Sequence, residues 1–334
     1  MKPITAIGLD IGSYAIKCVE ISQINRSIKL HRASILPLSD HSPKNILSIL
    51  DLIIDRGSAA AKKVRISVSG PSILIRRITL PLMTPHELKG AIRFEAESHI
   101  PFPIADCVLD FQILAQQPAK KTMTVLLVAV KRDFIDQRLK LLAQADIHPE
   151  VIDVDIFCLI NAYEVLSDSQ PEHAYGLLNI GHQVSSFAII QDKVPFFVRE
   201  IPFGGFQISE ALAEIKGVQA AEADKLKIDC PADLGEALKS ASRKGLEALA
   251  EELRHSVDYF ENESEQDLRS IWLSGGGALA KDASEVLSEE LGKKVSLWDN
   301  TKKMEVFGDV DQKFLADHSS ELNVALGMVL RGMA

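Results

Sequence analysis

One pattern occurs twice in this chain, as GLDIGSYAIKCVEIS at Gly8–Ser22 and as LLNIGHQVSSFAIIQ at Leu177–Gln191. In each copy an apolar strand ends in a polar residue, and Ile-Gly, a short polar turn and a second apolar strand follow. The first copy carries Asp10 where the second carries Asn179. This duplication predicts two related lobes, each with a glycine turn at the mouth of a sheet. Two such turns are suited to holding a nucleotide between them.

Length and charge narrow the class of protein. A chain of 334 residues is too long for one simple core and suggests about two lobes. A net charge of −9 and a pI of about 5.5 argue against nucleic acid and against direct adhesion to anionic lipid. No apolar stretch approaches the roughly 18 residues that span a bilayer, and no signal region opens the chain, so we expect a cytoplasmic or peripheral protein. Four scattered cysteines predict reduced, mostly buried thiols: Cys18, Cys107, Cys158 and Cys230.

The first lobe is expected to open with three strands and a helix. Period-2 apolar patterns and polar turns predict strands at Ile4–Leu9, Ile16–Ile21 and Ile28–Leu36, followed by a helix at Asn45–Asp55. The sequence pattern changes near Lys62, where KVRISVSG and ILIRRITLP read as further strands. Residues 64–145 are predicted to form a compact insert of strands and two helices.

Capping signals mark the first helix of that insert. Thr84 and Glu87 form a capping box in TPHELKGAIRFEAESHIPFP, and Pro85 suits the first helical turn. A second helix is predicted at Asp133–Ala145. An apolar helix at Ile156–Leu166 then leads to the second lobe.

The second lobe is predicted to contain three further strands, helices and a glycine turn. Its third strand is Pro195–Pro202, and apolar residues at helical spacing between Leu246 and Phe260 predict an amphipathic helix. A strand, glycine turn and helix follow in SIWLSGGGALAKDASEVLSEELG. A helix at Glu321–Leu330 closes the chain.

The first glycine turn carries groups suited to phosphate and metal. The N–H groups of Gly12, Ser13 and Tyr14 predict a small anion cradle, and Lys17 can return along the second strand as a point charge. Asp10 is placed to orient the water shell of Mg²⁺. A plain hairpin in which Asp10 caps the turn remains the alternative.

Two further motifs indicate nucleotide binding less specifically. Gly275, Gly276 and Gly277 follow a strand and let the backbone lie flat against a base or phosphate, with the next helix N-terminus favouring negative charge. A flexible connection would look the same. Glu222 and Lys225 share one helix face and are spaced to clamp a ribose and a base edge, although a solvated salt bridge has the same spacing.

The second glycine turn is expected to be less suited to catalysis than the first, because it lacks the carboxylate. Gly181, His182 and Gln183 follow Asn179, an asparagine that can hold a metal-bound water but cannot take its proton. IPFGG ends the third strand of this lobe and brings Gly205 to the same cleft. The histidines show no metal-ligand spacing, and no Ser-His-Asp or Cys-His set can be assigned, so no catalytic residue is named.

The order of these motifs resembles the actin-like ATPase superfamily, with its first phosphate loop at Asp10–Lys17, its second at Asn179–Ser186 and its adenosine motif at Leu273–Leu279. Within that superfamily the chain is similar to the PilM family of type IV pilus assembly proteins. The matching stretches cover most of the chain and include LDIGSYAIKCVEIS, RRITLPLMTPHELKGAIRFEAESHIPFP, LLVAVKRDFIDQRLKLLAQADIHPEVIDVDIFCLINAY, REIPFGGFQISEAL, EELRHSVDYFENES and IWLSGGGALA.

The resemblance implies an α/β, two-lobed actin-like ATPase (ribonuclease H-like) fold with a small α+β insert in the first lobe. It implies a first lobe of residues 1–63, 146–175 and 316–334, an insert of residues 64–145 and a second lobe of residues 176–315. It also implies ATP and Mg²⁺ in the cleft between the lobes. The implied contacts are Asp10 for the metal; Gly12, Ser13, Tyr14, Lys17, Gly181, His182, Gln183 and Gly205 for the phosphate loops; Glu222 and Lys225 for ribose and base; and Gly275, Gly276 and Gly277 behind the adenosine.

The resemblance further implies a cytoplasmic scaffold that is peripheral to the inner membrane through a partner. In this family the insert helps to form a groove for the short cytoplasmic N-terminal tail of a bitopic membrane protein, PilN, and other pilus platform components are implied with it. An extended tail with a few apolar anchors suits a groove between a sheet and a helix.

Two departures from the family pattern predict weak or absent hydrolysis. Asn179 stands where family members usually carry an aspartate, and general-base assistance is typically worth roughly 10²–10⁴-fold. The bulky Tyr14 replaces a small polar residue. Residues 301–320 form a longer segment than the family pattern predicts, and the sequence assigns them no role.

Two other classes remain open. One is an enzyme of the same superfamily, either a true ATPase or a small-molecule kinase, although no substrate-pocket carboxylate can be placed. The other is a polymerising division protein like FtsA. That family ends in a linker and an amphipathic membrane helix, whereas this chain stops four residues after Leu330, which favours the scaffold.

Overall fold

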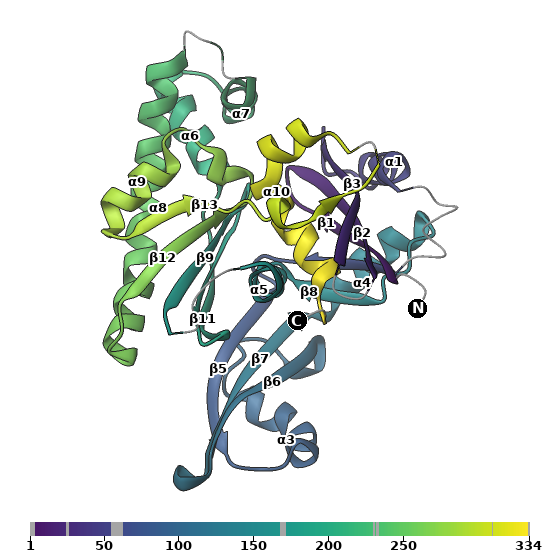
Figure 1. The fold of residues 1–334 in the computed structure, drawn as a ribbon, viewed down its shortest axis with the longest axis vertical. Helices are drawn as coiled ribbons and strands as arrows, with labels where there is room; N and C mark the ends of the chain where they lie inside the picture. Colours follow the sequence, from purple (N-terminus) through teal and green to yellow (C-terminus); the bar gives the residue numbers. More distant parts are fainter. Residues whose placement is uncertain are drawn as a thin grey trace.

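A computed structural model describes residues 4–24, 27–54, 63–167, 172–229, 231, 234–308 and 310–332. It is a mixed α/β structure with three sheets, two in the main body and one in an insert that projects away from it (Figure 1). The first sheet has the strand order β14-β3-β2-β1-β4-β8. Its strands are β1 (Ile4–Ile11), β2 (Ala15–Ile24), β3 (Ser27–Pro37), β4 (Lys63–Val68), β8 (Val151–Val154) and β14 (Glu305–Val306).

The second sheet has the order β11-β10-β9-β12-β13. Its strands are β9 (Ala174–Ile180), β10 (Ser185–Gln191), β11 (Val194–Ile201), β12 (Leu268–Ser274) and β13 (Lys294–Leu297). One face of this sheet shares a core with three helices, which are α6 (Gly205–Lys216), α8 (Gly235–Ser264) and α9 (Ala283–Leu291). α7 (Ala220–Asp229) packs on α6.

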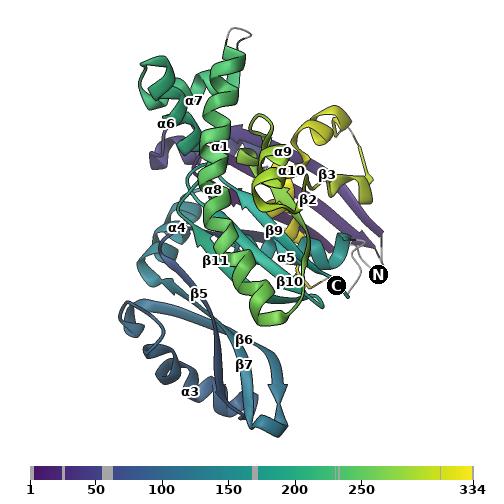
Figure 2. The same ribbon diagram turned by 90° about the vertical axis from the view of Figure 1, so that its left-hand side faces the viewer.

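The insert is a three-stranded antiparallel sheet and one helix. Its strand order is β5-β7-β6, and all three strands lie below the two main sheets in both views (Figures 1 and 2). A small core of its own joins the sheet to the helix. The elements are β5 (Ile73–Pro81), α3 (Pro85–Glu97), β6 (Cys107–Gln117) and β7 (Thr122–Lys131), with 3-10 turns at Ile104–Asp106 and Pro118–Lys120.

The predicted duplication is present in the strand pairing. β1 pairs antiparallel with β2 so that Asp10 faces Lys17, and β9 pairs antiparallel with β10 so that Asn179 faces Ser186. Each hairpin turn is closed by one hydrogen bond, from the Gly12 amide to the Ala15 carbonyl and from Gly181 to Val184. In the second copy uncharged residues therefore replace both the acid and the base of the first, with Asn179 in place of Asp10 and Ser186 in place of Lys17.

Two helices fill the space between the lobes. α5 (Asp155–Leu166) and α10 (Gln312–Leu330) pack on one another, α10 against the first sheet and α5 against the second. Glycines permit this approach: a Cβ on Gly327 would lie 1.7 Å from the carbonyl oxygen of Cys158, and one on Gly8 would lie 2.0 Å from that of Ala325. The opposite face of the first sheet is covered by α1 (Pro43–Ile53) and α4 (Arg132–Gln144).

The predicted strands, helices and capping box are present, but the predicted lobe boundaries differ from the structure. β4 lies in the first sheet between β1 and β8, and α4 packs on α1. The insert is therefore Ile73–Lys131 rather than 64–145. The Thr84–Glu87 capping box starts α3 as expected, since each side chain bonds the other's backbone N–H.

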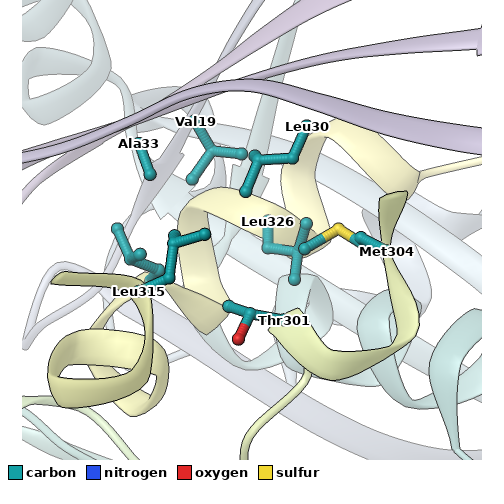
Figure 3. Close-up of a pocket in the computed structure, with 8 residues that line it drawn as sticks. Val19, Leu30, Ala33, Thr301, Met304, Leu315 and Leu326 are labelled. Atoms are coloured by element: carbon teal, nitrogen blue, oxygen red, sulfur yellow. The ribbon is translucent and has the colours of Figure 1, made fainter. Parts of the chain in front are cut away.

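The segment 301–320 builds an edge of the first lobe. β14 pairs with β3, the 3-10 turn Thr301–Lys303 precedes it, and the closing helix α10 begins at Gln312, nine residues before the predicted Glu321. Figure 3 shows the apolar gap that this segment seals; it leaves no volume (≈ 0 Å³) for a water. The chain thus returns to the first lobe well before the predicted residue 316. The gap is lined by Val19, Leu30, Ala33, Thr301, Met304, Leu315, Leu322 and Leu326.

The cysteines that the structure describes are reduced and buried. Cys18, Cys107 and Cys158 are buried free thiols, whereas the predicted Cys230 lies outside the described residues. In the part of the chain that the structure describes, no helix combines the length and the apolar character needed to cross a membrane.

Candidate functional site

The first glycine turn contains a buried ion pair. Lys17 Nζ lies 2.8 Å from Asp10 Oδ2, and the two side chains are 16% and 7% exposed. Burial disfavours the charged Lys17, but the charge and hydrogen bond of Asp10, together with the charges of Glu321 and Asp155, outweigh it, so the pKa of Lys17 is raised. Because Asp10 and Lys17 face one another on β1 and β2, the two predicted ligand groups neutralise each other in this structure.

The predicted anion cradle is smaller than expected. The Gly12 amide closes the hairpin by donating to Ala15, so Ser13 and Tyr14 supply the amides that remain for a phosphate. A Cβ on Gly12 would lie 3.1 Å from the Ala15 carbonyl oxygen and 3.8 Å from Lys17 Nζ. Gly12 is therefore required by the tight turn itself, whether or not a ligand binds there.

The second glycine turn is bound to the start of α6. Gly205 and Phe206 donate their amides to the carbonyls of Gly181 and His182 at 2.8 Å each. These bonds bring Gly181 and Gly205 together as predicted. They also use the first amides of α6, so that helix N-terminus is not free to bind an anion.

The two turns meet through aromatic rings. Tyr14 of the first turn and His182 of the second have ring centroids 5.4 Å apart, and His182 contacts Phe206 at the same separation. Burial lowers the pKa of His182 against the pull of Asp224, which favours the neutral ring at pH 7. Gln183, in the same turn, is exposed. A ligand that passes between the turns must separate Tyr14 from His182.

On α7 the residues that reach this region are not the predicted ones. Glu222 and Lys225 are exposed. Lys227 instead donates to the carbonyl of Gly205 at 2.6 Å and to Asp224 at 2.9 Å. Burial lowers the pKa of Lys227, with Asp224 opposing the shift. The contact of Glu222 and Lys225 with ribose and base stays a prediction.

The glycine triplet packs closely on the end of β9. Gly275 has φ +87°, and a Cβ there would lie 2.6 Å from Asn179 Oδ1; one on Gly277 would lie 2.4 Å from Ile180 Cγ2. Gly276 faces Glu321 of α10. The triplet runs into the 3-10 turn Gly276–Leu279, and α9 starts only at Ala283. The expected helix N-terminus directly after the glycines is therefore absent.

Sequence reasoning missed three charged side chains that are linked to the first turn directly or through one another; Asp155 is buried, and Glu200 and Arg138 are partly buried. Asp155 begins α5, and burial together with the Asp10 charge raises its pKa to about 6. Glu200 is the last residue but one of β11, and burial raises its pKa to about 7 with Asp155 adding to the shift. Arg138 of α4 donates to the Ile11 carbonyl at 3.5 Å, and burial lowers its pKa. Both acids lie next to apolar residues, but Asp153 and Arg199 are close to them in the sequence, so the local pattern does not single them out.

The donor set fits a nucleotide better than it fits a metal. Backbone amides, three converging glycine turns and two lysines are the groups that bind phosphates. Across the described ranges, no group of three or more His, Cys, Asp or Glu side chains is placed to hold a metal ion. Asp10 could meet Mg²⁺ only through one carboxylate that Lys17 now occupies, with water completing the shell.

Two lobes that each open with a strand, a glycine turn and a strand, with two helices between them, define a protein of the actin-like ATPase fold. The fold is shared by the ethanolamine utilization protein EutJ of Carboxydothermus hydrogenoformans (14% identity, TM-score 0.56, 99% of this chain and 91% of that chain). It is also shared by MreB5 of Spiroplasma citri bound to ADP (10% identity, TM-score 0.51, 99% and 96%).

The chain belongs to the PilM family of type IV pilus assembly proteins. The family model described as "Type IV pilus assembly protein PilM" matches residues 8–333. A solved structure described as the "PilM-PilN type IV pilus biogenesis complex" matches with a TM-score of 0.84 and 26% identity, over 98% of each chain. The resemblance of the sequence motifs to this family is thereby confirmed.

Proposed function

We propose that this protein is a nucleotide-binding scaffold of a type IV pilus platform, held at the cytoplasmic side of the inner membrane by the short N-terminal tail of a PilN-like bitopic protein. The observation that carries the proposal is the similarity over 98% of both chains to the PilM–PilN complex structure. The family match across residues 8–333 supports the same role.

The insert is the proposed tail-binding unit. It combines a helix, a three-stranded sheet and solvent-exposed apolar side chains, which suit an extended peptide with apolar anchors. Phe94 on α3 is 78% exposed, and Leu82 and Val108 lie at 37% and 36%. Exposed apolar side chains of this kind mark a binding surface, because a partner that covers them removes apolar area from water.

The cleft between the turns is the proposed nucleotide site. Lys17, the Ser13 and Tyr14 amides and the Gly181 turn would hold the phosphates, and Glu222 and Lys225 would meet the ribose and base. ATP with Mg²⁺ is the proposed ligand, with Asp10 meeting the metal's water shell. The negative charge of the bound phosphates would attract Lys17 away from Asp10, while the nucleotide separates Tyr14 from His182.

Hydrolysis is proposed to be slow. Asn179 cannot accept a proton and packs beside Gly275. A slow ATPase is nonetheless the second candidate, because the Asp155 carboxylate is buried close enough to Asp10 to feel its charge. ATP turnover that falls in Asp155→Asn and in Asp10→Asn alike would favour the enzyme. Turnover at background in the wild type would exclude it.

The scaffold proposal is tested by binding a synthetic peptide of the N-terminal cytoplasmic tail of the same organism's PilN. Phe94→Asp should weaken binding at least tenfold, because it places a charge among the proposed apolar anchors. Leu52→Asp is the matched control, since Leu52 on α1 is 75% exposed on another unit and should bind like wild type. Equal affinities for wild type and Phe94→Asp would contradict the proposed face.

A further inference from the structure

Glu200 joins the second lobe to the root of the insert. Its carboxylate oxygens accept a hydrogen bond from the Gly70 amide, at 3.0 Å to Oε1 and 2.9 Å to Oε2. Glu200 lies near the end of β11, in the second sheet. Gly70 lies in the turn between β4 and β5, where the chain leaves the first sheet for the insert. One side chain therefore joins the second sheet to the turn at which the chain leaves the first sheet for the insert.

The geometry of this junction is specific. Gly70 is buried and has φ +112°, a conformation that favours glycine. A second tether lies further along β5, where Arg77 donates to the Phe196 carbonyl at 3.0 Å and stacks over the Phe196 ring at 4.6 Å. β5 and β11 contact each other, and both views show β5 rising to meet β11 (Figures 1 and 2).

Glu200 is also in electrostatic contact with the cradle. Asp155 of α5 is the charged group that acts on it, and Asp155 in turn feels Asp10 and Lys17. The other charges near the junction are engaged elsewhere. Arg77 of β5 bonds Phe196, and Arg199 of β11 bonds Glu252 of α8 at 2.8 Å. In the first hairpin the register position that corresponds to Glu200 is held by Ile35, so the acid is particular to the second copy.

We propose that Glu200 is a latch between the second lobe and the β4–β5 turn at the root of the insert, closed when its carboxyl group holds the Gly70 amide and released when the lobes part. The phosphate cradle biases the latch through Asp155. The latch itself requires only the contacts above. Its consequence for tail binding rests on the proposed function, because it would make the position of the tail-binding insert depend on the cleft.

The protonation state of Glu200 decides whether the closed or the open form of the latch is favoured at a given pH. The Gly70 hydrogen bond favours the charged carboxylate, but burial and the Asp155 charge outweigh it and raise the pKa to about 7. An open latch exposes Glu200 to water, where its pKa returns toward the ordinary value. The closed form thus binds a proton that the open form lacks, and the closed-to-open ratio should fall about tenfold or more between pH 5.5 and pH 7.5.

The test is hydrogen exchange of the Gly70 amide, followed by NMR in protein labelled with ¹⁵N-glycine. The chain has 19 glycines, so the spectrum is sparse, and loss of one signal in Gly70→Ala assigns the peak. The protection factor, corrected for the intrinsic pH dependence of exchange, should fall about tenfold from pH 5.5 to pH 7.5 in the wild type. A protection factor independent of pH would overturn the proposal.

Three variants separate the latch from a general structural role. Glu200→Gln keeps an acceptor for Gly70 without a titrating group, so protection should persist and lose its pH dependence. Glu200→Ala should lose protection at both pH values. Arg77→Gln is the matched control, because it removes the second tether and should retain the wild-type pH dependence. A pH dependence in Glu200→Gln equal to that of the wild type would overturn the assignment to Glu200.

This experiment needs neither nucleotide nor tail, so its outcome is independent of the proposed function. Repeating it with Mg²⁺ and ATP then tests the link to the cradle. Nucleotide should change the Gly70 protection factor of the wild type more than threefold and that of Glu200→Gln less. An equal change in both proteins would contradict the route through Glu200. Failure of the protein to bind ATP would instead leave the pH result standing and contradict the proposed function.

Discussion

Lys17 and Asp10 form a buried ion pair across the first hairpin, with Lys17 Nζ 2.8 Å from Asp10 Oδ2. Each group therefore satisfies the other where a phosphate and a metal are expected to bind. A phosphate that takes Lys17 frees Asp10 for the metal's water shell, so the two ligands should bind together. The corresponding pair of the second hairpin, Asn179 and Ser186, has no charge to exchange.

Removing one member of this pair should destabilise the protein more than removing both. Asp10→Ala leaves Lys17 charged and buried, which costs about 3–5 kcal/mol, whereas Asp10→Ala with Lys17→Met removes both charges and should recover part of that loss. Urea denaturation of the two single variants and the double variant measures the coupling. Strictly additive losses would show that the pair is not an energetic unit.

The ring contact between Tyr14 and His182 should oppose nucleotide entry. Ring pairs contribute about 0.5–1.5 kcal/mol, so Tyr14→Ser should tighten ATP binding by up to about tenfold. Tyr14→Phe retains the ring and serves as the control with wild-type affinity. Calorimetric titration of both variants decides the point, and weaker binding by Tyr14→Ser would mean that the ring supports the nucleotide.

Stability should fall as pH rises through neutrality because of Glu200 and Asp155. Both have pKa values raised in the folded state, to about 7 and about 6, so each contribution is full below the ordinary pKa and is lost as pH rises through the folded one. Glu200→Gln should therefore be more stable than wild type by about 1–3 kcal/mol at pH 8 and nearly equal at pH 4.5. Thermal unfolding at both pH values tests this; a variant less stable at pH 8 would refute it.

Arg65 caps the end of α10. Its Nη1 donates to the carbonyls of Met328, Val329 and Arg331 at 3.1, 3.3 and 3.0 Å, while Nε bonds Glu150 at 3.1 Å. Arg65→Met should cost about 1–3 kcal/mol, since the last carbonyls of the helix lose a charged donor. Denaturant unfolding measures the loss. Arg65→Lys keeps the charge but not the fork, and full rescue by lysine would argue that geometry is unimportant there.

Gly327 permits the crossing of α5 and α10. A Cβ at this position would lie 1.7 Å from the Cys158 carbonyl oxygen, so Gly327→Ala must separate the helices and should cost several kcal/mol (roughly 3 or more). Gly90→Ala is the control, because nothing lies within 4 Å of its Cβ and alanine favours α3 by about 0.5–1 kcal/mol. Equal melting temperatures for Gly327→Ala and wild type would contradict the close crossing.

Local pattern was enough to predict much of the fold. The paired hairpins, the capping box of α3 and the long helix α8 follow from period and capping residues, which act within a few positions along the chain. The lobe boundaries depend on pairing between distant segments. β4 joins β1, and β14 joins β3, by hydrogen bonds that no local pattern encodes.

The candidate site was predicted less completely for the same reason. The two glycine turns were found because their chemistry is contiguous in sequence. Asp155 and Glu200 approach each other from α5 and β11, so their raised pKa values exist only in the folded chain. On α7, one helical face was predicted through Glu222 and Lys225, whereas packing against α6 selects Asp224 and Lys227.

The central claim is that the cleft of this PilM-family protein binds nucleotide. The most direct measurement is calorimetric titration of purified, nucleotide-stripped protein with ATP and Mg²⁺. We predict one-to-one binding in the micromolar range, weakened in Lys17→Met and accompanied by a raised melting temperature. No detectable heat, together with an unchanged melting temperature, would contradict the claim and leave the insert as the functional part of the molecule.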